Sequence, residues 1–270
     1  MTICISAICE GKGDHPHVVI ASDRMITSEG LSIEFEQKQN KIFEASSSCA
    51  IVSAGDALSP ADILRRAQSG INEMTAPSIE EVANKIKDEL VKYRKEDVED
   101  QILKPRGFGN LEQFYEKMQS LPPDIYTVID DRISRFDDIE KTFVEFLVSG
   151  IDETGAHIYS VYSPGRKSCF DTIGYNAIGT GDTHAVSVLT SYNYTNNVSL
   201  NDAIWIVYEA KRRAEKAPGV GRGTDMCVIT KSKVTHLEDK LLKELETQFK
   251  KKGEQETVWL RQIPKFELGA

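Results

Sequence analysis

The order of strand-like and helix-like segments constrains this chain more than any other feature of its sequence. β-Branched and apolar residues dominate 2–9, 17–23, 142–150 and 157–162, which predicts two hairpins, and a further strand is expected around 169–173. Pairs of amphipathic helical segments separate these regions. Strands joined as hairpins pair antiparallel, whereas alternating βαβ units would give a parallel sheet. The pattern predicts an α+β protein, arranged as a four-layer α/β/β/α sandwich of two antiparallel sheets.

Sequence signals for helix starts occur at three places. Ser59–Asp62, Ser78–Glu81 and Ser199–Asp202 each place a serine three residues before an acidic residue. The serine hydroxyl and the acidic side chain can satisfy backbone N–H groups that have no partner within the first turn. Apolar residues follow each of these segments at helical spacing. We expect a helix to begin at each of them.

The domain organisation follows from these segments. Residues 1–236 are expected to form one main domain with a helical insertion near 95–141, and residues 237–270 a C-terminal helix and tail. Within the insertion, one apolar stripe is predicted to face a small core and consists of Leu111, Phe114, Tyr115 and Met118.

Charge and composition exclude several classes of function. The formal net charge is −9, which argues against binding to nucleic acid or to anionic membranes. No apolar run approaches the ~20 residues of a spanning helix, and no signal peptide is visible. The 5 cysteines are scattered without a CxxC pair, as in a cytoplasmic protein with reduced thiols. His15 and His17 have no nearby cysteine or carboxylate cluster of ligand spacing, so we expect no metal site there. No residue pattern demands an organic cofactor, and none is expected.

The second residue is a candidate nucleophile. Thr2 opens the first predicted strand, and its small side chain permits removal of the initiator Met1. The new terminus would carry a hydroxyl and a free α-amine on one residue, an arrangement in which the amine acts as the base for the hydroxyl. The pKa of an α-amine, about 7.7–8.0, suits this task near neutral pH.

Several short segments, taken in order, resemble one known family. The chain is similar to proteasome β-type subunits, which are N-terminal nucleophile (Ntn) hydrolases. The resemblance covers most of 2–60 and 142–230. The matching segments are the strand from Thr2, Val18–Arg24, Asn40–Glu44, Ala54–Ala57, Ile178–Gly181 and Gly223–Ile229.

The resemblance implies a set of site residues. Thr2 would be the nucleophile, with Asp23 and Lys41 beside it, and the Lys41 ammonium would favour the ionised hydroxyl. The backbone N–H of Gly55 would face the developing oxyanion. Thr180 would join the network around the terminal amine. Taken singly, such residues are more often surface ion pairs or turns, so the interpretation depends on the four positions around Thr2 together.

The chain also departs from the family pattern. The family commonly has an Asp and a Ser in the loop before its last core strand, where this chain has Ala217 and Val220. Asp182 and Arg222 are the nearby residues that could compensate. Here Thr2 follows Met1 directly, so removal of Met1 would expose the nucleophile without autoproteolysis.

The resemblance implies an N-terminal threonine hydrolase that cleaves amide bonds, most simply peptide bonds, through an acyl-enzyme on Thr2. Attack by another amine on this intermediate would give transpeptidation. Two alternatives stay open: a catalytically silent structural subunit, which a retained Met1 would indicate, and a small-molecule amidase. The implied partners are a peptide or protein substrate and further copies of the chain in a homo-oligomer, with a ring as one form. Specificity is expected near Arg24, Met25 and the loop after Gly55.

Overall fold

The computed structural model describes residues 2–11, 15–28, 33–37, 40–55, 59–136 and 144–262. The loop after Gly55, the end of the predicted insertion and the end of the C-terminal tail lie outside these residues. Every strand pair within the described part is antiparallel. The α+β class with antiparallel sheets is therefore confirmed.

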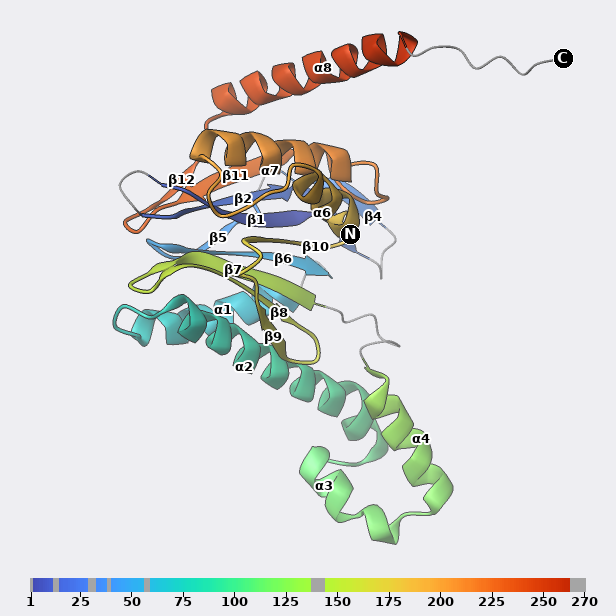
Figure 1. Cartoon of the computed structure of the whole chain (residues 1–270). Coiled ribbons are helices and arrows are strands. Elements are labelled where there is room, and N and C mark those ends of the chain that lie inside the picture. Colours follow the sequence, from blue (N-terminus) through green and yellow to red (C-terminus); the bar gives the residue numbers. More distant parts are fainter. Residues whose placement is uncertain are drawn as a thin grey trace, which may run out of the picture.

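Two larger sheets form the centre of the molecule (Figure 1). The first has the order β10–β1–β2–β11–β12, with bounds Tyr175–Ile178, Cys4–Cys9, His17–Asp23, Thr224–Ile229 and Val234–His236. The second has the order β5–β6–β7–β8–β9, with bounds Phe43–Ser46, Cys49–Gly55, Val144–Asp152, Gly155–Tyr162 and Arg166–Cys169. A separate hairpin pairs β3, Met25–Ser28, with β4, Ile33–Glu36.

Both predicted hairpins are present, since β1 pairs with β2 and β7 with β8. The prediction of one strand around 169–173 is wrong. Two strands flank this segment and belong to different sheets: β9 pairs with β8, and β10 pairs with β1. Residues 170–173 cross from one sheet to the other as a turn, in which the N–H groups of Ile173 and Gly174 donate to the Phe170 carbonyl.

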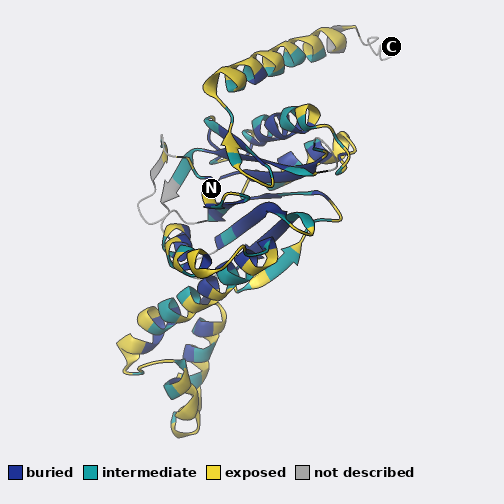
Figure 2. Cartoon of the chain, turned by 90° about the vertical axis from the view of Figure 1, so that its left-hand side faces the viewer, coloured by how far each residue is buried: buried dark blue, intermediate teal, exposed yellow. Residues whose placement is uncertain are grey.

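Side-chain alternation along β1 buries both faces of the first sheet. Ile3 and Ile5 pack toward α6, Asp182–Ser191, and α7, Leu200–Ala214, whereas Cys4 and Ile8 face the second sheet. The outer face of the second sheet packs in turn against α1, Ser59–Glu73, and α2, Ile79–Val98. Figure 2 shows the result, with buried strands between helices whose outer surfaces are exposed.

Local capping explains two of the helix starts. Ser78 accepts from the backbone N–H of Glu81, whose carboxylate accepts from the Ser78 N–H, so this capping box is confirmed. Ser199 caps α7 by accepting from the N–H of Asp202. Ser59, by contrast, is the first residue of α1 and not the residue before it.

The predicted helical insertion projects from the end of α2 as an arm (Figure 1). A π-helical turn, Glu99–Leu103, leads to short 3₁₀ turns and to α3, Leu111–Glu116, and α4, Pro123–Ser134. A separate cluster around Phe114 and Phe136 holds the arm together, and the ring of Phe114 stacks on Tyr126 at 5.5 Å. The predicted apolar stripe is correct only in part, because Tyr115 and Met118 are 46% and 39% exposed.

The last helix, α8, spans Asp239–Arg261 and lies on the outer side of α7 (Figure 1). Leu245 joins the core cluster beneath it, and the guanidinium groups of Arg212 and Arg213 lie over the ring of Phe249. No described helix combines the length and apolar character needed to cross a membrane.

A buried hydroxyl pair in the apolar layer between the sheets gives a stability test. Ser149 Oγ donates to Ser6 Oγ at 2.9 Å, and both residues are buried. Ser149→Ala should lower the free energy of unfolding by about 1–2 kcal/mol, because the Ser6 hydroxyl loses its partner. Adding Ser6→Ala should cost little more. Denaturant unfolding measures both changes.

Ser22 provides the matched control. It is a buried serine on the neighbouring strand, and its hydroxyl has no hydrogen-bond partner among the described residues. Ser22→Ala should be neutral or stabilising. Equal losses for Ser22→Ala and Ser149→Ala would contradict the role given to the hydrogen bond.

Candidate active site

Thr2 lies at the entrance of β1, between β2 and β10, and only 3% of its surface is exposed. Its carbonyl oxygen accepts long hydrogen bonds of 3.4 Å from the Gly181 N–H and the Thr180 hydroxyl. Gly179 approaches this carbonyl so closely that a Cβ there would lie 2.4 Å from the oxygen, and its φ is +97°. The segment from Gly179 to Gly181 therefore fixes the backbone of Thr2.

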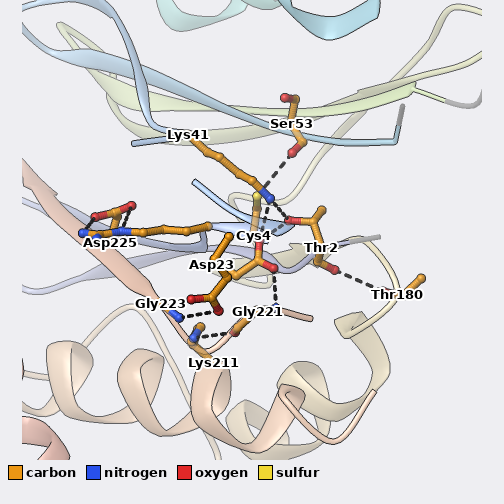
Figure 3. A network of polar contacts seen from close by, with 12 residues as sticks. Thr2, Cys4, Asp23, Lys41, Ser53, Thr180, Lys211, Gly221, Gly223 and Asp225 are labelled. Carbon is orange, nitrogen blue, oxygen red and sulfur yellow. Dashed lines mark hydrogen bonds and ion pairs between the residues drawn. The ribbon is translucent and has the colours of Figure 1, made fainter. Parts of the chain in front are cut away.

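The structure brings together the side chains of three predicted residues, Thr2, Asp23 and Lys41 (Figure 3). The Thr2 hydroxyl donates to Asp23 Oδ1. Lys41 Nζ lies 2.7 Å from Thr2 Oγ and 2.8 Å from Asp23 Oδ1. Asp23 ends β2, where its own N–H donates to the Ile3 carbonyl, and Lys41 lies just before β5. Two sheets thus contribute to one cluster.

Because Asp23 is buried, its carboxylate needs the other members of this cluster as partners. Asp23 is fully buried, and an isolated carboxylate there would cost several kcal/mol. The Lys41 ammonium and the Gly221 N–H, which donates to Asp23 Oδ2 at 2.7 Å, compensate its charge. Lys41 can in turn stabilise negative charge on Thr2 Oγ, because it already donates to that atom.

Thr180 joins two parts of the site. Its hydroxyl contacts the Thr2 carbonyl at 3.4 Å and the Pro218 carbonyl at 3.3 Å. It therefore contacts the backbone of Thr2 and the loop before β11. Its predicted place in the network of the terminal amine stays a prediction.

Gly55 ends β6 on the second sheet. Two residues earlier, the Ser53 carbonyl accepts the Cys4 thiol at 3.4 Å, which links the end of β6 to the start of β1 (Figure 3). Burial raises the pKa of the Cys4 thiol to about 12, so this thiol stays neutral and does not compete as a nucleophile. The role of Gly55 as oxyanion donor stays a prediction.

The loop at 217–223 carries functional contacts that the sequence analysis missed. Ala217 and Val220 are buried and apolar, so their side chains provide no hydrogen bonds. The Gly221 N–H contacts Asp23 instead. Arg222 takes part through its backbone carbonyl, which accepts a hydrogen bond from Lys211. Asp182 lies at the start of α6, where its carboxylate accepts from the Thr183 hydroxyl at 3.0 Å.

Two charged side chains flank this loop. Lys211 of α7 donates to the Gly221 and Arg222 carbonyls, and Glu36 of β4 accepts from the Arg222 and Gly223 N–H groups. The Gly223 N–H is the main cause that holds the pKa of Glu36 below its ordinary value. A sequence signal for Lys211 existed, because it lies four residues after Val207 on the apolar face of its helix.

Arg24, where specificity was expected, pairs with Asp225 on the neighbouring strand β11. The two nitrogen–oxygen contacts are 2.9 and 2.5 Å, and the Asp225 hydrogen bond raises the pKa of the guanidinium. This fork fixes the start of the β3–β4 hairpin beside the site. No cluster of three or more metal-ligating side chains occurs in the described ranges.

Antiparallel sheets with Thr2 at the start of a central strand, next to an aspartate and a lysine, are consistent with an Ntn-type fold. Curated relatives agree with this assignment. The chain is 30% identical to proteasome subunit beta 2 of Thermofilum pendens over 125 residues, 44% of this chain and 58% of that protein. It is 36% identical to proteasome subunit beta 2 of Pyrobaculum calidifontis over 100 residues, 37% and 47% of the two chains.

A third relative is proteasome subunit beta of Methanospirillum hungatei, which is 35% identical over 98 residues, 36% of this chain and 46% of that protein. The chain thus spans about half the length of the curated relatives it matches. No protein-family model matches it. The resemblance to proteasome β subunits is thus confirmed over the matched part of the chain.

Gly179 gives a test of how the site is held. Gly179→Ala should cost roughly 3 kcal/mol or more of unfolding free energy, because the new methyl group would displace the Thr2 carbonyl in addition to straining the backbone. Gly107→Ala is the control: its φ is +84° and nothing lies within 4 Å of the added Cβ. It should cost about 1–2 kcal/mol. Equal losses would show that Gly179 does not hold Thr2.

Glu36 gives a pH test. Its pKa is lowered in the folded state, so its carboxylate adds stability above its ordinary pKa and loses this contribution as the pH falls. Glu36→Gln should therefore flatten the pH dependence of the unfolding midpoint on the acid side of pH ~4.5. The comparison uses thermal unfolding from pH 6 to pH 3. An unchanged acid limb in the variant would contradict the contact.

Proposed function

We propose that this protein is an N-terminal threonine hydrolase that cleaves amide bonds, and most simply peptide bonds, through an acyl-enzyme on Thr2. One observation carries the proposal. Lys41 Nζ lies 2.7 Å from the hydroxyl oxygen of Thr2, and the lysine is paired with the fully buried Asp23. A cation in this position favours negative charge on a hydroxyl oxygen, which is what a nucleophile requires.

The mechanism begins with removal of Met1, which frees the α-amine of Thr2. Thr2 Oγ attacks the substrate carbonyl carbon while its proton passes to this amine. The C–N bond then breaks, the leaving amine takes the proton, and the acyl group remains on Oγ as an ester. Water, deprotonated by the same amine, hydrolyses the ester. Attack by a second amine in place of water would give transpeptidation.

Stabilisation of charge comes from groups that are already fixed. The Lys41 ammonium opposes the charge that develops on Thr2 Oγ, and the Gly55 N–H is assigned to the oxyanion on the substrate carbonyl. Removing one such donor typically lowers kcat by about 10²–10³-fold. Thr180 would hold the Thr2 backbone during the reaction.

The wider organisation is part of the same proposal. We assign the packing of helices and sheets as the four-layer α/β/β/α sandwich of Ntn hydrolases, with residues 1–236 as the main domain and 237–270 as an appended helix and tail. By analogy with relatives that are named as proteasome subunits, we infer a cytoplasmic homo-oligomer, with a ring as the form to test.

A catalytically silent structural subunit is the second candidate. The buried apolar residues Ala217 and Val220 favour it, because the family commonly has an Asp and a Ser at these positions of the loop. The two candidates differ at the N-terminus. A retained Met1 leaves no free amine to act as the base, whereas a processed chain has one.

Intact mass spectrometry with a β-lactone or epoxyketone probe tests the proposal. The purified protein should lack the mass of Met1 and gain one probe adduct, since a β-lactone acylates the Thr2 hydroxyl and an epoxyketone reacts with both the hydroxyl and the free α-amine. Thr2→Ala should take no label. Thr154→Ala, in the β7–β8 turn away from the site, should label as the wild type does. A retained Met1, or a free Thr2 that takes no label, would favour the structural subunit.

A further inference from the structure

Lys211 is a buried charge that the proposed reaction does not use. Its side chain is 0% exposed and lies in the last turn of α7. It has three acceptors: the Gly221 carbonyl at 2.9 Å, the Arg222 carbonyl at 3.0 Å and Glu215 Oε1 at 2.7 Å. An ammonium group has three N–H donors, so each donor has one partner. Burial lowers its pKa and the carboxylate of Glu215 partly offsets this.

Glu36 contacts the same peptide groups from the opposite side. The Gly221 carbonyl and the Arg222 N–H belong to one peptide group; the first accepts from Lys211 and the second donates to Glu36. The next peptide group repeats the pattern, with its carbonyl on Lys211 and the Gly223 N–H at 3.0 Å from Glu36. A cation on the carbonyl side and an anion on the amide side match both peptide dipoles.

The loop held by Lys211 and Glu36 also contacts the carboxylate of Asp23. The Gly221 N–H belongs to the peptide group just before the two that Lys211 and Glu36 contact, and it donates to Asp23 Oδ2 at 2.7 Å (Figure 3). Asp23 Oδ1 is thereby left facing Thr2 and Lys41. The terminal torsion of an aspartate has a broad energy profile, so a fixed donor on Oδ2 is needed to hold the carboxylate plane. A Cβ at residue 221 would lie 3.0 Å from the backbone nitrogen of Met25 and 2.9 Å from Glu36 Oε1, so the space favours glycine.

We propose that Lys211 is a positioning residue of the threonine site: together with Glu36 it clamps two peptide groups of the 217–223 loop, and through the Gly221 amide it fixes the orientation of Asp23. This inference rests on the proposed function for its effect on rate. Two charged side chains acting on the backbone thus hold a loop in which the side chains of Ala217 and Val220 are buried and apolar.

The main test compares Lys211→Met with Arg213→Met. Methionine keeps the unbranched shape and most of the buried volume of the lysine but has no N–H donors. Arg213 lies on the same helix and pairs with Glu209 and Glu256, away from the loop. In Lys211→Met, hydrogen exchange of the Gly221 amide should quicken at least about tenfold. The rate of Thr2 labelling and kcat should fall about 10–100-fold, as expected for a misplaced catalytic group, while KM changes less than about twofold. Arg213→Met should change none of these.

Lys211→Arg and Glu36→Gln complete the test. Arginine keeps the charge and the donors, so this variant should recover part of the lost labelling rate. Glu36 is exposed, so Glu36→Gln should fold, and it should quicken exchange of the Gly221 amide in the same direction. It keeps the inference testable if Lys211→Met does not fold.

The outcomes separate the two proposals. A folded Lys211→Met that keeps wild-type exchange at Gly221 and a wild-type labelling rate overturns the clamp. Unchanged exchange in Glu36→Gln does the same if Lys211→Met does not fold. If the wild-type protein takes no label, the proposal of a threonine hydrolase is wrong. Hydrogen exchange of the Gly221 amide in Lys211→Met, compared with the wild type, then decides whether Lys211 fixes the loop.

Discussion

The arrangement of the site depends on Asp23, whose carboxylate is fully buried and needs partners that compensate its charge. Its charge is compensated by an ammonium from the second sheet and a backbone amide from the loop before β11. Each of these contacts requires that the two sheets and the loop be in place. Removing either partner would leave a buried charge, which the folded state tolerates poorly. The polar cluster at the proposed site therefore also fixes how the sheets meet.

In the loop at 217–223, backbone groups rather than side chains make the polar contacts with Asp23, Lys211 and Glu36. Peptide groups have fixed dipoles, and they can be held firmly when a cation faces the carbonyls and an anion faces the amides. Lys211 and Glu36 do this from a helix and from a separate hairpin. The apolar residues of the loop are then free to pack against the helical layer, as Ala217 and Val220 do.

Sequence reasoning succeeded where the signal was local. The hairpins and the Ser78 capping box depend on neighbouring residues, and the structure contains them. Thr2, Asp23 and Lys41 were placed through the resemblance, and the structure brings them together. Lys211 and the Gly221 amide were missed, because a backbone donor has no sequence signature and only the apolar residues of the Lys211 helix were considered from the sequence. The segment 169–173 was misassigned because β9 ends at Cys169 and the residues that follow turn toward the other sheet.

The sequence by itself determined the periodicities, the helix starts and the kind of chemistry available, since a threonine at the second position, a strand-ending aspartate and a lysine are visible one residue at a time. Tertiary structure alone decided which of these groups touch. The distance between Lys41 and Thr2 Oγ depends on how two sheets pack face to face. The loop that carries the Gly221 amide is held in part by one side chain, Glu36 of β4, which is more than 180 residues away in the sequence. Contacts at such separation arise from packing, which local patterns do not encode.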